Sequence, residues 1–328
     1  MGITMKDIAR EAGVSITTVS KIINNKDMNI SEQTRQRVLE IAKRENYTPN
    51  AMAKSLRAKT SNFIGVILPD ITNPFFSTIV RGVEDTAKRY GFGVVFCNTD
   101  NNPQREAECF GFLNSRMVDG VIFTRSLLAG NGDNVLENDL PIVIIDRDTE
   151  IPNATVGKVF VDTVSAVHEA TGLLIQEGCR KIAYISALHH LERDRYGGFL
   201  TALHDHGMEC DSQLVFRGEY NVETGMQGIE TILKYALPDG VVCGNDLIAT
   251  GVLSVLNAKG YRIPQEVRVI GMDDIYMSQF LSPPLTTIRQ PAYEIGASAA
   301  KMIADYIMLG KPLYAKQLSY EIIHRESV

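Results

Sequence analysis

Apolar residues recur at helical spacing in two short segments at the start of the chain. The first segment, residues 4–12, predicts a helix whose apolar face consists of Met5, Ile8, Ala9 and Ala12. Thr4 is placed to cap this helix, and Gly13 ends it because glycine adopts the left-handed conformation without a steric penalty. A second helix is predicted to start at Ser15, and its buried stripe consists of Val14, Val19, Ile22 and Ile23. The pattern therefore predicts two short helices joined by a tight turn.

A third amphipathic helix and a short polar segment follow. Ser31 is placed to cap this helix, whose predicted inward positions are Val38, Leu39, Ile41 and Ala42. Its outward positions are basic, namely Arg35, Arg37, Lys43 and Arg44. Pro49 then ends the helix, and Asn50 is placed to cap one more short helix. Two helices joined by a glycine turn, with small, polar and basic residues exposed on the second, are typical of a DNA-binding helix-turn-helix.

From Asn62 onward, short apolar runs alternate with amphipathic segments. The runs predicted to be strands are 63–68, 93–97, 118–123, 142–146, 181–185, 240–243, 267–271 and a closing strand at 317–323. The segments predicted to be helices are 75–90, 105–115, 164–177, 196–206, 224–235, 246–259 and 292–309. Such alternation predicts parallel sheets with helices on both faces, and two series predict two lobes. Ligands of such sheets bind beyond the carboxyl ends of the strands.

Charged residues are distributed unevenly along the 328-residue chain, whose net charge is −6. Residues 1–59 contain eleven Lys and Arg against six Asp and Glu, whereas the remaining residues contain 22 against 33. A basic end on an acidic body indicates a protein that presents one end to a polyanion such as DNA.

The cysteines are spread singly, without a C-x-x-C pair or a histidine at zinc spacing, and they are Cys97, Cys109, Cys179, Cys210 and Cys243. This pattern predicts reduced thiols in a cytoplasmic protein rather than a disulfide or metal framework. No segment has membrane-spanning length, and the amino terminus is a polar helix rather than an apolar signal segment. The pair His189-His190 is expected to be solvated in a loop. We therefore expect no metal site and no membrane partner.

Catalytic and cofactor-binding motifs are missing from the sequence. It contains no G-x-G-x-x-G dinucleotide turn, no G-x-x-x-x-G-K-[ST] phosphate loop and no G-x-S-x-G nucleophile turn. The sequence therefore predicts a protein that is not an enzyme and has no cofactor.

Residues 4–57 resemble the headpiece and hinge of the lactose-repressor/galactose-repressor (LacI/GalR) family of bacterial transcription regulators. The matching motifs, in order and spacing, are the Gly-Val-Ser turn, the Thr-Val-Ser-Lys segment and the Tyr-Thr-Pro-Asn…Ser-Leu-Arg hinge. The remainder is similar to the regulatory domain of that family. The resemblance implies a small all-α helix-turn-helix headpiece plus an α/β two-lobed, periplasmic-binding-protein-like body with parallel sheets.

The resemblance also implies where the domains begin and end. The headpiece is expected at residues 1–49, the hinge helix and linker at 50–60, and the effector-binding and dimerisation domain at 61–328. Within that domain, lobe 1 is expected at about 61–160 and 291–322, and lobe 2 at about 161–290 and 323–328. The chain would then cross between lobes near residues 160, 290 and 322.

The family pattern places three side chains of the second helix in the major groove of double-stranded operator DNA. Ile16 is suited to a thymine methyl group, Thr17 can donate or accept, and Lys21 can reach guanine or a phosphate. The alternative is that all three are ordinary surface residues of a helix. Phosphate contacts are expected from Thr4, Ser15, Thr18, Ser20, Asn24 and Asn25.

The hinge supplies the remaining DNA-binding candidates, which are Asn50, Lys54 and Leu56. An apolar residue in a short polar hinge is suited to wedge between base steps in the minor groove, and the family uses a leucine in this way. The alternative is that Leu56 packs against the body. A helix this short is not stable alone, so the hinge is expected to order only with DNA and a partner hinge.

Positions matching the family's effector pocket are Asn73, Phe75, Phe76, Asp146, Arg193, Tyr220, Asn245, Asp273 and Gln290. Carboxylates, amides and a guanidinium around aromatic faces suit a polyhydroxyl ligand such as a sugar. Other interpretations remain, since Asp146 can cap a turn and Arg195 can be a structural ion-pair partner. Asp274 is expected to be a helix cap rather than a contact. The segment from His189 to Asp194 departs from the family pattern, which leaves a phosphorylated sugar, an anionic metabolite and a plain saccharide open.

The sequence thus predicts a homodimeric, effector-controlled, DNA-binding transcription regulator, most simply a repressor. Two alternatives from other classes are a sugar-binding transport protein and an α/β enzyme with an appended DNA-binding domain. The missing signal segment and the basic headpiece argue against the first, and the missing catalytic motifs argue against the second. Whether the effector is an inducer or a corepressor is left open.

Overall fold

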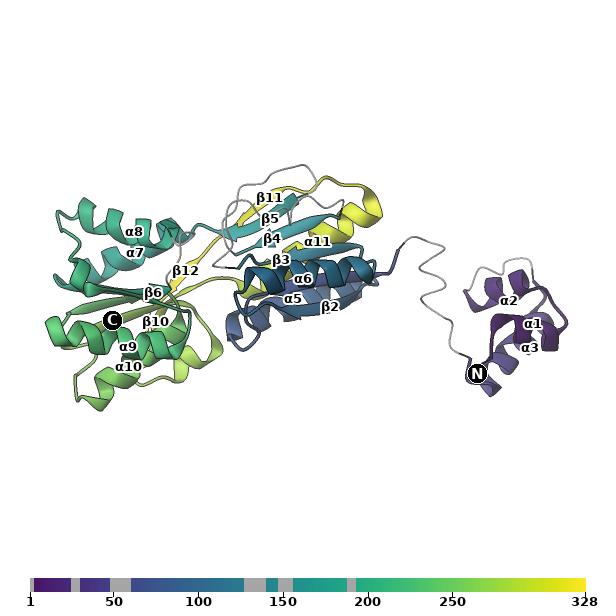
Figure 1. The fold of residues 1–328 in the computed structure, drawn as a ribbon, viewed down its shortest axis with the longest axis horizontal. Coiled ribbons are helices and arrows are strands. Elements are labelled where there is room, and N and C mark those ends of the chain that lie inside the picture. The colour runs from purple at the N-terminus through teal and green to yellow at the C-terminus, as the bar shows by residue number, and fades with distance from the viewer. Residues whose placement is uncertain (1–2, 25–29, 48–59, 127–139, 147–155, 188–192) are drawn as a thin grey trace. The chain divides into compact units, whose positions relative to one another are not determined.

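The computed structural model describes residues 3–24, 30–47, 60–126, 140–146, 156–187 and 193–328, and of residues 193 and 194 it describes only the backbone (Figure 1). The chain divides into two compact units, Met1–Ser61 and Asn62–Val328. We call the first the headpiece and the second the body, and describe each by itself.

The described part of the headpiece contains three helices around a small core. They are α1 (Met5–Ala12), α2 (Ile16–Ile23) and α3 (Glu32–Arg44). The core consists of Ile8, Ala9, Ala12, Val19, Ile22, Val38 and Ile41. Gly13 ends α1 with φ of 64°, and the side chains and backbones of Thr4 and Asp7 bond reciprocally at its start. The prediction for Leu39 is wrong, because 43% of its surface is exposed and α3 turns only Val38 and Ile41 fully inward.

The body contains two six-stranded sheets, one in each lobe. In spatial order, the lobe 1 sheet consists of β11 (Ala315–Leu318), β5 (Val156–Val161), β4 (Ile142–Ile145), β3 (Gly120–Phe123), β1 (Phe63–Leu68) and β2 (Gly93–Asn98). The lobe 2 sheet consists of β12 (Glu321–Ile323), β10 (Thr286–Arg289), β9 (Arg268–Asp273), β8 (Gly240–Cys243), β6 (Ile182–Ala187) and β7 (Val215–Gly218). Neighbouring strands are parallel except β10 and β12. The predicted two-lobed α/β fold is therefore confirmed.

Helices cover both faces of each sheet (Figure 1). In lobe 1, α5 (Pro74–Arg89) and α11 (Ala292–Leu309) supply residues to the core on one face, and α6 (Pro103–Ser115) to the core on the other. In lobe 2, α7 (Thr163–Gln176) and α8 (Arg193–Asp205) lie on one face, and α9 (Val222–Tyr235) and α10 (Asp246–Ala258) on the other. Two short 3-10 helices, η2 (Ser212–Leu214) and η3 (Tyr276–Phe280), complete the elements of lobe 2.

The chain passes between the lobes after β5, after β10 and after β11. The single closing strand predicted at 317–323 is wrong, because β11 pairs with β5 in lobe 1 and β12 pairs with β10 in lobe 2. The third crossing therefore lies between Leu318 and Glu321 rather than near residue 322. A continuous polar–apolar alternation in the sequence does not reveal that its two halves join different sheets.

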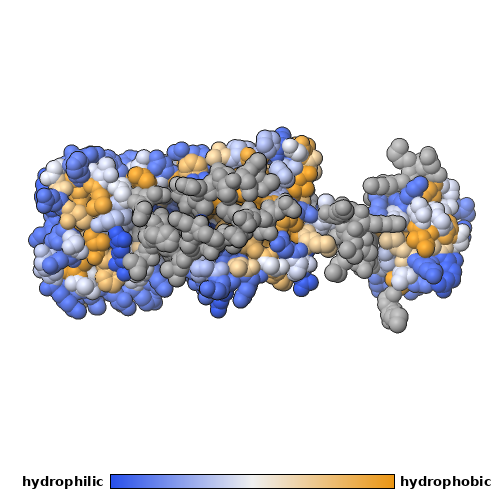
Figure 2. Space-filling view, turned by 45° about the horizontal axis from the view of Figure 1, so that its top comes forward, coloured by the Kyte–Doolittle hydropathy of each residue, from blue (hydrophilic) through white to orange (hydrophobic). Residues whose placement is uncertain are grey.

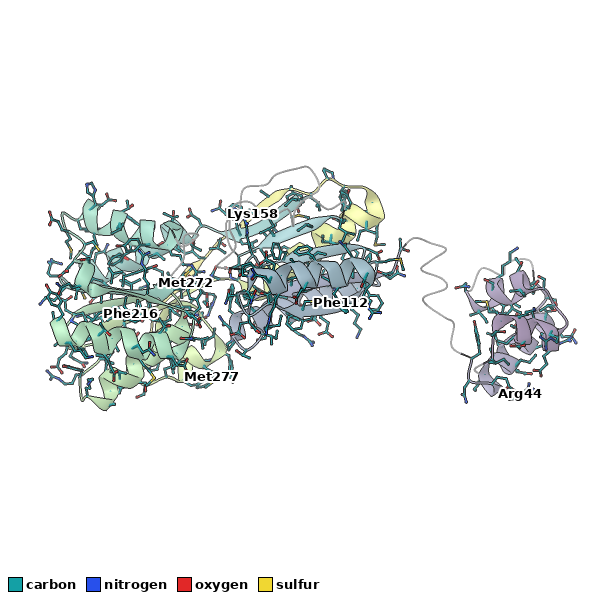
Figure 3. The ribbon with its side chains drawn as sticks, in the orientation of Figure 1. Arg44, Phe112, Lys158, Phe216, Met272 and Met277 are labelled. Atoms are coloured by element: carbon teal, nitrogen blue, oxygen red, sulfur yellow. The ribbon has the colours of Figure 1, made fainter. Side chains whose placement is uncertain are left out.

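Three strands were missing from the sequence-based prediction, and their composition explains why. β5 contains Gly157 and Lys158, β7 has four residues, and β10 reads Thr-Thr-Ile-Arg. Lys158, labelled in Figure 3, is only 7% exposed. Its ammonium lies 4.4 Å from the centre of the Phe160 ring. The ring lies two residues further along the same strand, and the strands β4 and β11 flank β5 in the sheet. β3 also begins two residues later than predicted.

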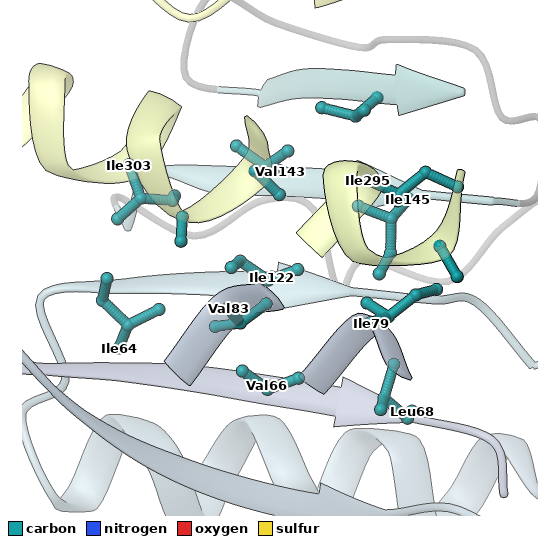
Figure 4. Close-up of a cluster of buried hydrophobic side chains, with 14 of the residues drawn as sticks. Ile64, Val66, Leu68, Ile79, Val83, Ile122, Val143, Ile145, Ile295 and Ile303 are labelled. Carbon is teal, nitrogen blue, oxygen red and sulfur yellow. The ribbon is translucent and has the colours of Figure 1, made fainter. Parts of the chain in front are cut away.

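The largest core lies under α5 and α11 in lobe 1 (Figure 4). Among the labelled side chains, Val66 on β1, Ile122 on β3 and Val143 on β4 point into it together with Ile79 and Ile295 from the helices. The two helices approach closely at one place. A Cβ on Gly82 would lie 2.1 Å from the Tyr293 carbonyl oxygen, and one on Gly296 2.0 Å from that of Ile79. Glycine at both positions is therefore required by this crossing.

All five cysteines are free thiols. Burial raises the pKa of Cys109 to about 12 and that of Cys179 to about 11, so the reactive thiolate is disfavoured at both. Among the described residues, no helix combines the length and apolar character needed to cross a membrane. Figure 2 shows apolar residues in several places on the visible face of the body, interspersed with hydrophilic ones.

Candidate DNA-binding surface and ligand site

Helix α2 presents one polar face to solvent. The Ser15 hydroxyl caps it by accepting a hydrogen bond from the Thr18 backbone amide at 3.0 Å. Val19 and Ile22 are buried and attach the opposite face to the headpiece core. Ile16, Thr17 and Lys21 are exposed, and Ile16 keeps 49% of its surface accessible. An apolar side chain half-exposed on a small capped helix is available for contact with another molecule.

The described phosphate-contacting candidates lie at the start of α1 and along α2 with its two caps. Thr4 caps α1, and its hydroxyl donates to the Asp7 carboxylate at 2.6 Å. Asn24 follows α2, and its amide donates to the Ser20 carbonyl at 2.7 Å. Thr18 bonds Ser15 through its hydroxyl at 2.9 Å. The other predicted DNA contacts lie outside the described residues, and these are Asn25, Asn50, Lys54 and Leu56.

In the body, the predicted ligand contacts follow the carboxyl ends of strands. Asn73 comes after β1 and caps α5, its side-chain oxygen accepting from the Phe75 amide at 3.0 Å. Asn245 comes after β8 and caps α10, accepting from the Ile248 amide at 2.9 Å. Both amides are buried. Each therefore has a structural task that the sequence does not distinguish from ligand contact.

The two predicted aromatic contacts are core residues of lobe 1. Phe75 and Phe76 are 3% and 5% exposed, with ring centres 5.3 Å apart in an edge-on arrangement. Both belong to the core under α5 and α11. Their packing accounts for their apolar character independently of any ligand.

A buried polar cluster joins the two lobes, and we define it as Asp146, Arg195, Tyr220, Asp273 and Gln290. The Arg195 guanidinium lies 3.6 Å from the Asp146 carboxylate across the lobes, and the two side chains are 12% and 5% exposed. It also donates to the Gly244 carbonyl at 2.8 Å and to the Tyr220 hydroxyl at 3.2 Å. Its charged carbon lies 5.2 Å from the Tyr220 ring centre. Arg195 is thus a single cation held between elements of both lobes.

Asp273 is the second carboxylate of the polar cluster. It is 6% exposed, and its Oδ1 accepts a hydrogen bond from the Gln290 amide at 2.8 Å. Burial raises the pKa of Asp273 well above its ordinary value, the Arg195 charge opposes that rise, and the charges of Asp246 and Asp146 add to it. Two carboxylates, one guanidinium, an amide and a phenol provide both donors and acceptors for adjacent hydroxyl groups.

Arg193 and Arg195 lie in the first turn of α8 rather than in the expected loop. Arg193 begins α8, and its side chain lies outside the described residues. Arg195, for which the sequence left a pocket position and a structural ion-pair role open, pairs with Asp146 and is the described cation of the polar cluster. Its position two residues after Arg193 was the available signal, but residues two apart on a helix point in different directions.

The helix-cap prediction for Asp274 is wrong. The η3 helix begins without a side-chain cap, and the Asp274 carboxylate instead pairs with Arg289 at 2.7 Å and Arg325 at 2.6 Å. A turn cap alone does not describe Asp146, because its carboxylate also pairs with the Arg195 guanidinium. Within the described ranges, no cluster of three His, Cys, Asp or Glu side chains is placed to hold a metal ion. His189, His190 and Glu192 lie outside these ranges.

Family profiles match both units of the chain. Residues 4–50 match "Bacterial regulatory proteins, lacI family", and residues 61–320 match "Periplasmic binding proteins and sugar binding domain of LacI family". The chain belongs to the LacI family. It is a DNA-binding transcriptional regulator with the sugar-binding domain of that family.

Similar LacI-family proteins cover the whole chain. The HTH-type transcriptional regulator RegA of Clostridium saccharobutylicum is 35% identical, over 100% of this chain and 99% of RegA. The structure of the transcriptional regulator CelR in complex with cellobiose is 28% identical, with a TM-score of 0.74, and covers 99% of this chain and 100% of CelR. The lac repressor dimer bound to operator and the anti-inducer ONPF is 22% identical, with a TM-score of 0.87 over 100% and 99% of the chains, which shows the common fold.

Proposed function

We propose that this protein is a homodimeric, cytoplasmic repressor that binds operator DNA through α2. A sugar that binds at the polar cluster would lower or raise its affinity for the operator. The observation that supports DNA reading is the exposed face of α2, where Ile16, Thr17 and Lys21 lie on a helix capped and anchored from behind. The relatives that match along the whole chain are transcriptional regulators, which favours this role over a transport protein or an enzyme.

The first prediction concerns Lys21. The full-length protein should select a pseudo-palindromic site from random DNA, and its affinity should fall steeply with salt. Lys21→Ala should weaken binding to the selected site by about 1–3 kcal/mol if the ammonium contacts a base. Fluorescence anisotropy on selected and single-base-changed duplexes measures this.

The matched control is Lys43→Ala, which removes an exposed basic residue of α3 instead. It should cost less than Lys21→Ala on the selected site. An equal loss for Lys21→Ala on every sequence would show a phosphate contact and withdraw its base-reading role. Leu56 in the hinge is proposed as the minor-groove wedge on the family pattern, and Asn50 and Lys54 as its flanking contacts.

The ligand proposal rests on the composition of the polar cluster. Its groups are fixed by contacts with both lobes, so a sugar bound there would sense their relative placement. Asn73, Phe75, Phe76, Arg193 and Asn245 complete the proposed site on the family pattern. A thermal-shift screen of mono- and disaccharides identifies the ligand, because a ligand at a hundred times its Kd stabilises the fold by about 2.7 kcal/mol.

The second prediction concerns Asp273. Asp273→Asn should weaken binding of the sugar so identified by about 1.5–3 kcal/mol at a pH high enough to ionise the wild-type carboxyl, because a charge-assisted hydrogen bond is lost. The loss should shrink as the pH falls, since the raised pKa of Asp273 means that the wild-type carboxyl becomes neutral at a pH where an ordinary aspartate stays charged. Isothermal titration calorimetry at several pH values measures it.

Operator binding by the same variant assigns the direction of control. If the sugar is an inducer, Asp273→Asn should bind operator normally without it and resist release. If the sugar is a corepressor, the variant should lose operator binding at sugar concentrations that saturate the wild type. A sugar whose affinity is unchanged at every pH would place the ligand site elsewhere.

The third prediction is that the protein is a dimer in solution. Three neighbouring apolar side chains of η3 are largely exposed, Tyr276 by 72%, Met277 by 52% and Phe280 by 60%. A group of this kind on a folded domain marks an interaction surface, and the lac repressor neighbour is a dimer. Sedimentation equilibrium should give twice the chain mass, and Tyr276→Asp should lower that mass. A monomeric wild type would contradict the proposal.

A further inference from the structure

The end of β9 and the turn that follows it carry residues with different surroundings. Asp273 belongs to the polar cluster, Asp274 pairs with two arginines, and Ile275 is 7% exposed. Asp273 and Asp274 have positive φ values of 113° and 52°. Residues with a Cβ adopt such values rarely, so this conformation persists only where surrounding contacts fix it.

The side chain of Ile275 reaches from lobe 2 into lobe 1. Although it follows a lobe 2 strand, its side chain belongs to the buried core under α5 and α11 of lobe 1. Leu247, in the first turn of α10, packs partly buried against the same core. These two side chains form an apolar contact between the lobes beside the polar cluster.

Asp246 precedes Leu247 at the start of α10, and its carboxylate accepts hydrogen bonds from the turn. It is fully buried, and its Oδ2 accepts from the Ile275 amide at 2.9 Å and from the Ser278 hydroxyl at 2.5 Å. Its Oδ1 accepts from the Thr287 hydroxyl of β10 at 2.6 Å. A Cβ on Gly271 would lie 2.2 Å from this oxygen, so the glycine leaves the space that the carboxylate fills. One side chain thus ties α10, β10 and both ends of the 275–278 segment together.

We propose that Asp246 is a positioning residue of the ligand site: its carboxylate fixes the turn from Asp273 to Ser278, which presents Asp273 to the polar cluster and Ile275 to lobe 1. Asp246 itself is not a ligand contact in this proposal. This proposal rests on the proposed function only because it takes Asp273 to bind the sugar.

Asp246 is buried beside other ionisable groups of lobe 2. Asp274 and Asp273 are carboxylates on the turn that it holds, and the Cys243 thiol lies on β8 beside it. Burial raises the pKa of Asp246 to about 7. Such surroundings disfavour ionisation of the Asp246 carboxyl. Its hydrogen bonds to the turn offset part of the cost of burying the charge.

The test compares three variants of the full-length protein. Asp246→Ala removes the acceptor, Asp246→Asn keeps an acceptor of the same shape, and Ile232→Ala is a matched control that removes a buried side chain of α9 in the same lobe. Hydrogen exchange of the peptide containing Ile275 should be faster by about tenfold or more in Asp246→Ala, because a buried amide is left without its acceptor. Asp246→Asn and Ile232→Ala should stay near the wild-type rate.

Ligand affinity is the second measurement, with cellobiose as the first probe. Asp246→Ala should weaken cellobiose binding by about tenfold or more, and Asp246→Asn should restore it. Ile232→Ala should lower the melting temperature without changing affinity. If Asp246→Ala does not fold, Ser278→Ala removes one of the same hydrogen bonds and should move both measurements in the same direction.

Two failures are distinguishable. Equal exchange of the Ile275 peptide in Asp246→Ala and Ile232→Ala would overturn the positioning role, as would a loss of cellobiose affinity shared by both. If the wild type binds neither cellobiose nor any sugar of the screen, the proposed ligand class fails, and the exchange measurement still decides whether Asp246 holds the turn.

Discussion

Arg195→Met is expected to lower the free energy of unfolding of the body by about 3 kcal/mol at pH 8, because it leaves the buried Asp146 and Asp273 without their shared cation. Methionine fills a similar volume but cannot replace the hydrogen bonds to the Gly244 carbonyl and the Tyr220 hydroxyl. Urea unfolding of the full-length protein, followed by circular dichroism, measures the loss. Sugar binding should be lost in the same variant.

The loss should become smaller at acidic pH. Removing Arg195 removes the charge that opposes the raised pKa of Asp273, so this carboxyl takes up a proton more readily and the uncompensated charge disappears. Arg105→Met is the matched control, since Arg105 pairs with Asp100 on the surface, where the two side chains are 53% and 56% exposed. It should change stability by less than about 1 kcal/mol. Equal effects of the two substitutions would contradict a structural role for the Arg195 pair.

The stability of the body is expected to fall as the pH rises from 4 towards 8, and Asp246 should account for a large part of the fall. Burial raises the pKa of Asp246 from its ordinary 3.8 to about 7. Between these values the folded state keeps a proton that the unfolded state has released, so the slope of unfolding free energy against pH is negative. The shift corresponds to a contribution of the order of 4 kcal/mol, complete above pH 7.

Comparison with Asp246→Asn isolates this contribution. Asparagine does not titrate, so the difference in unfolding free energy, wild type minus variant, should decrease steadily between pH 4 and 7 and then level off. The carboxylates with lowered pKa, such as Asp205 beside His168 and Glu266 beside Arg262, are common to both proteins and cancel. A difference independent of pH would show that Asp246 titrates alike in the folded and unfolded chain.

Caps, apolar spacing and glycine turns made much of this protein readable from its sequence. The three headpiece helices and most strands and helices of the body depend on interactions within a few residues, such as Ser15 with Thr18 or Asn245 with Ile248. The headpiece motifs also indicated the family. The side chains that α2 exposes also follow from this local pattern, because they are the ones that do not pack into the headpiece core.

Tertiary structure alone decided which distant residues act together. The strands that the sequence did not reveal, β5, β7 and β10, are stabilised by their neighbours in the sheets, and the closing segment divides between two sheets for the same reason. Arg195 meets Asp146, and Asp246 meets Ile275, Ser278 and Thr287, across separations of 29 residues or more. Local sequence determined where each polar side chain lies on its own element. Burial by segments distant in the sequence determined which of them are paired and which of their pKa values change, because desolvation and charge pairing depend on distance in space rather than along the chain.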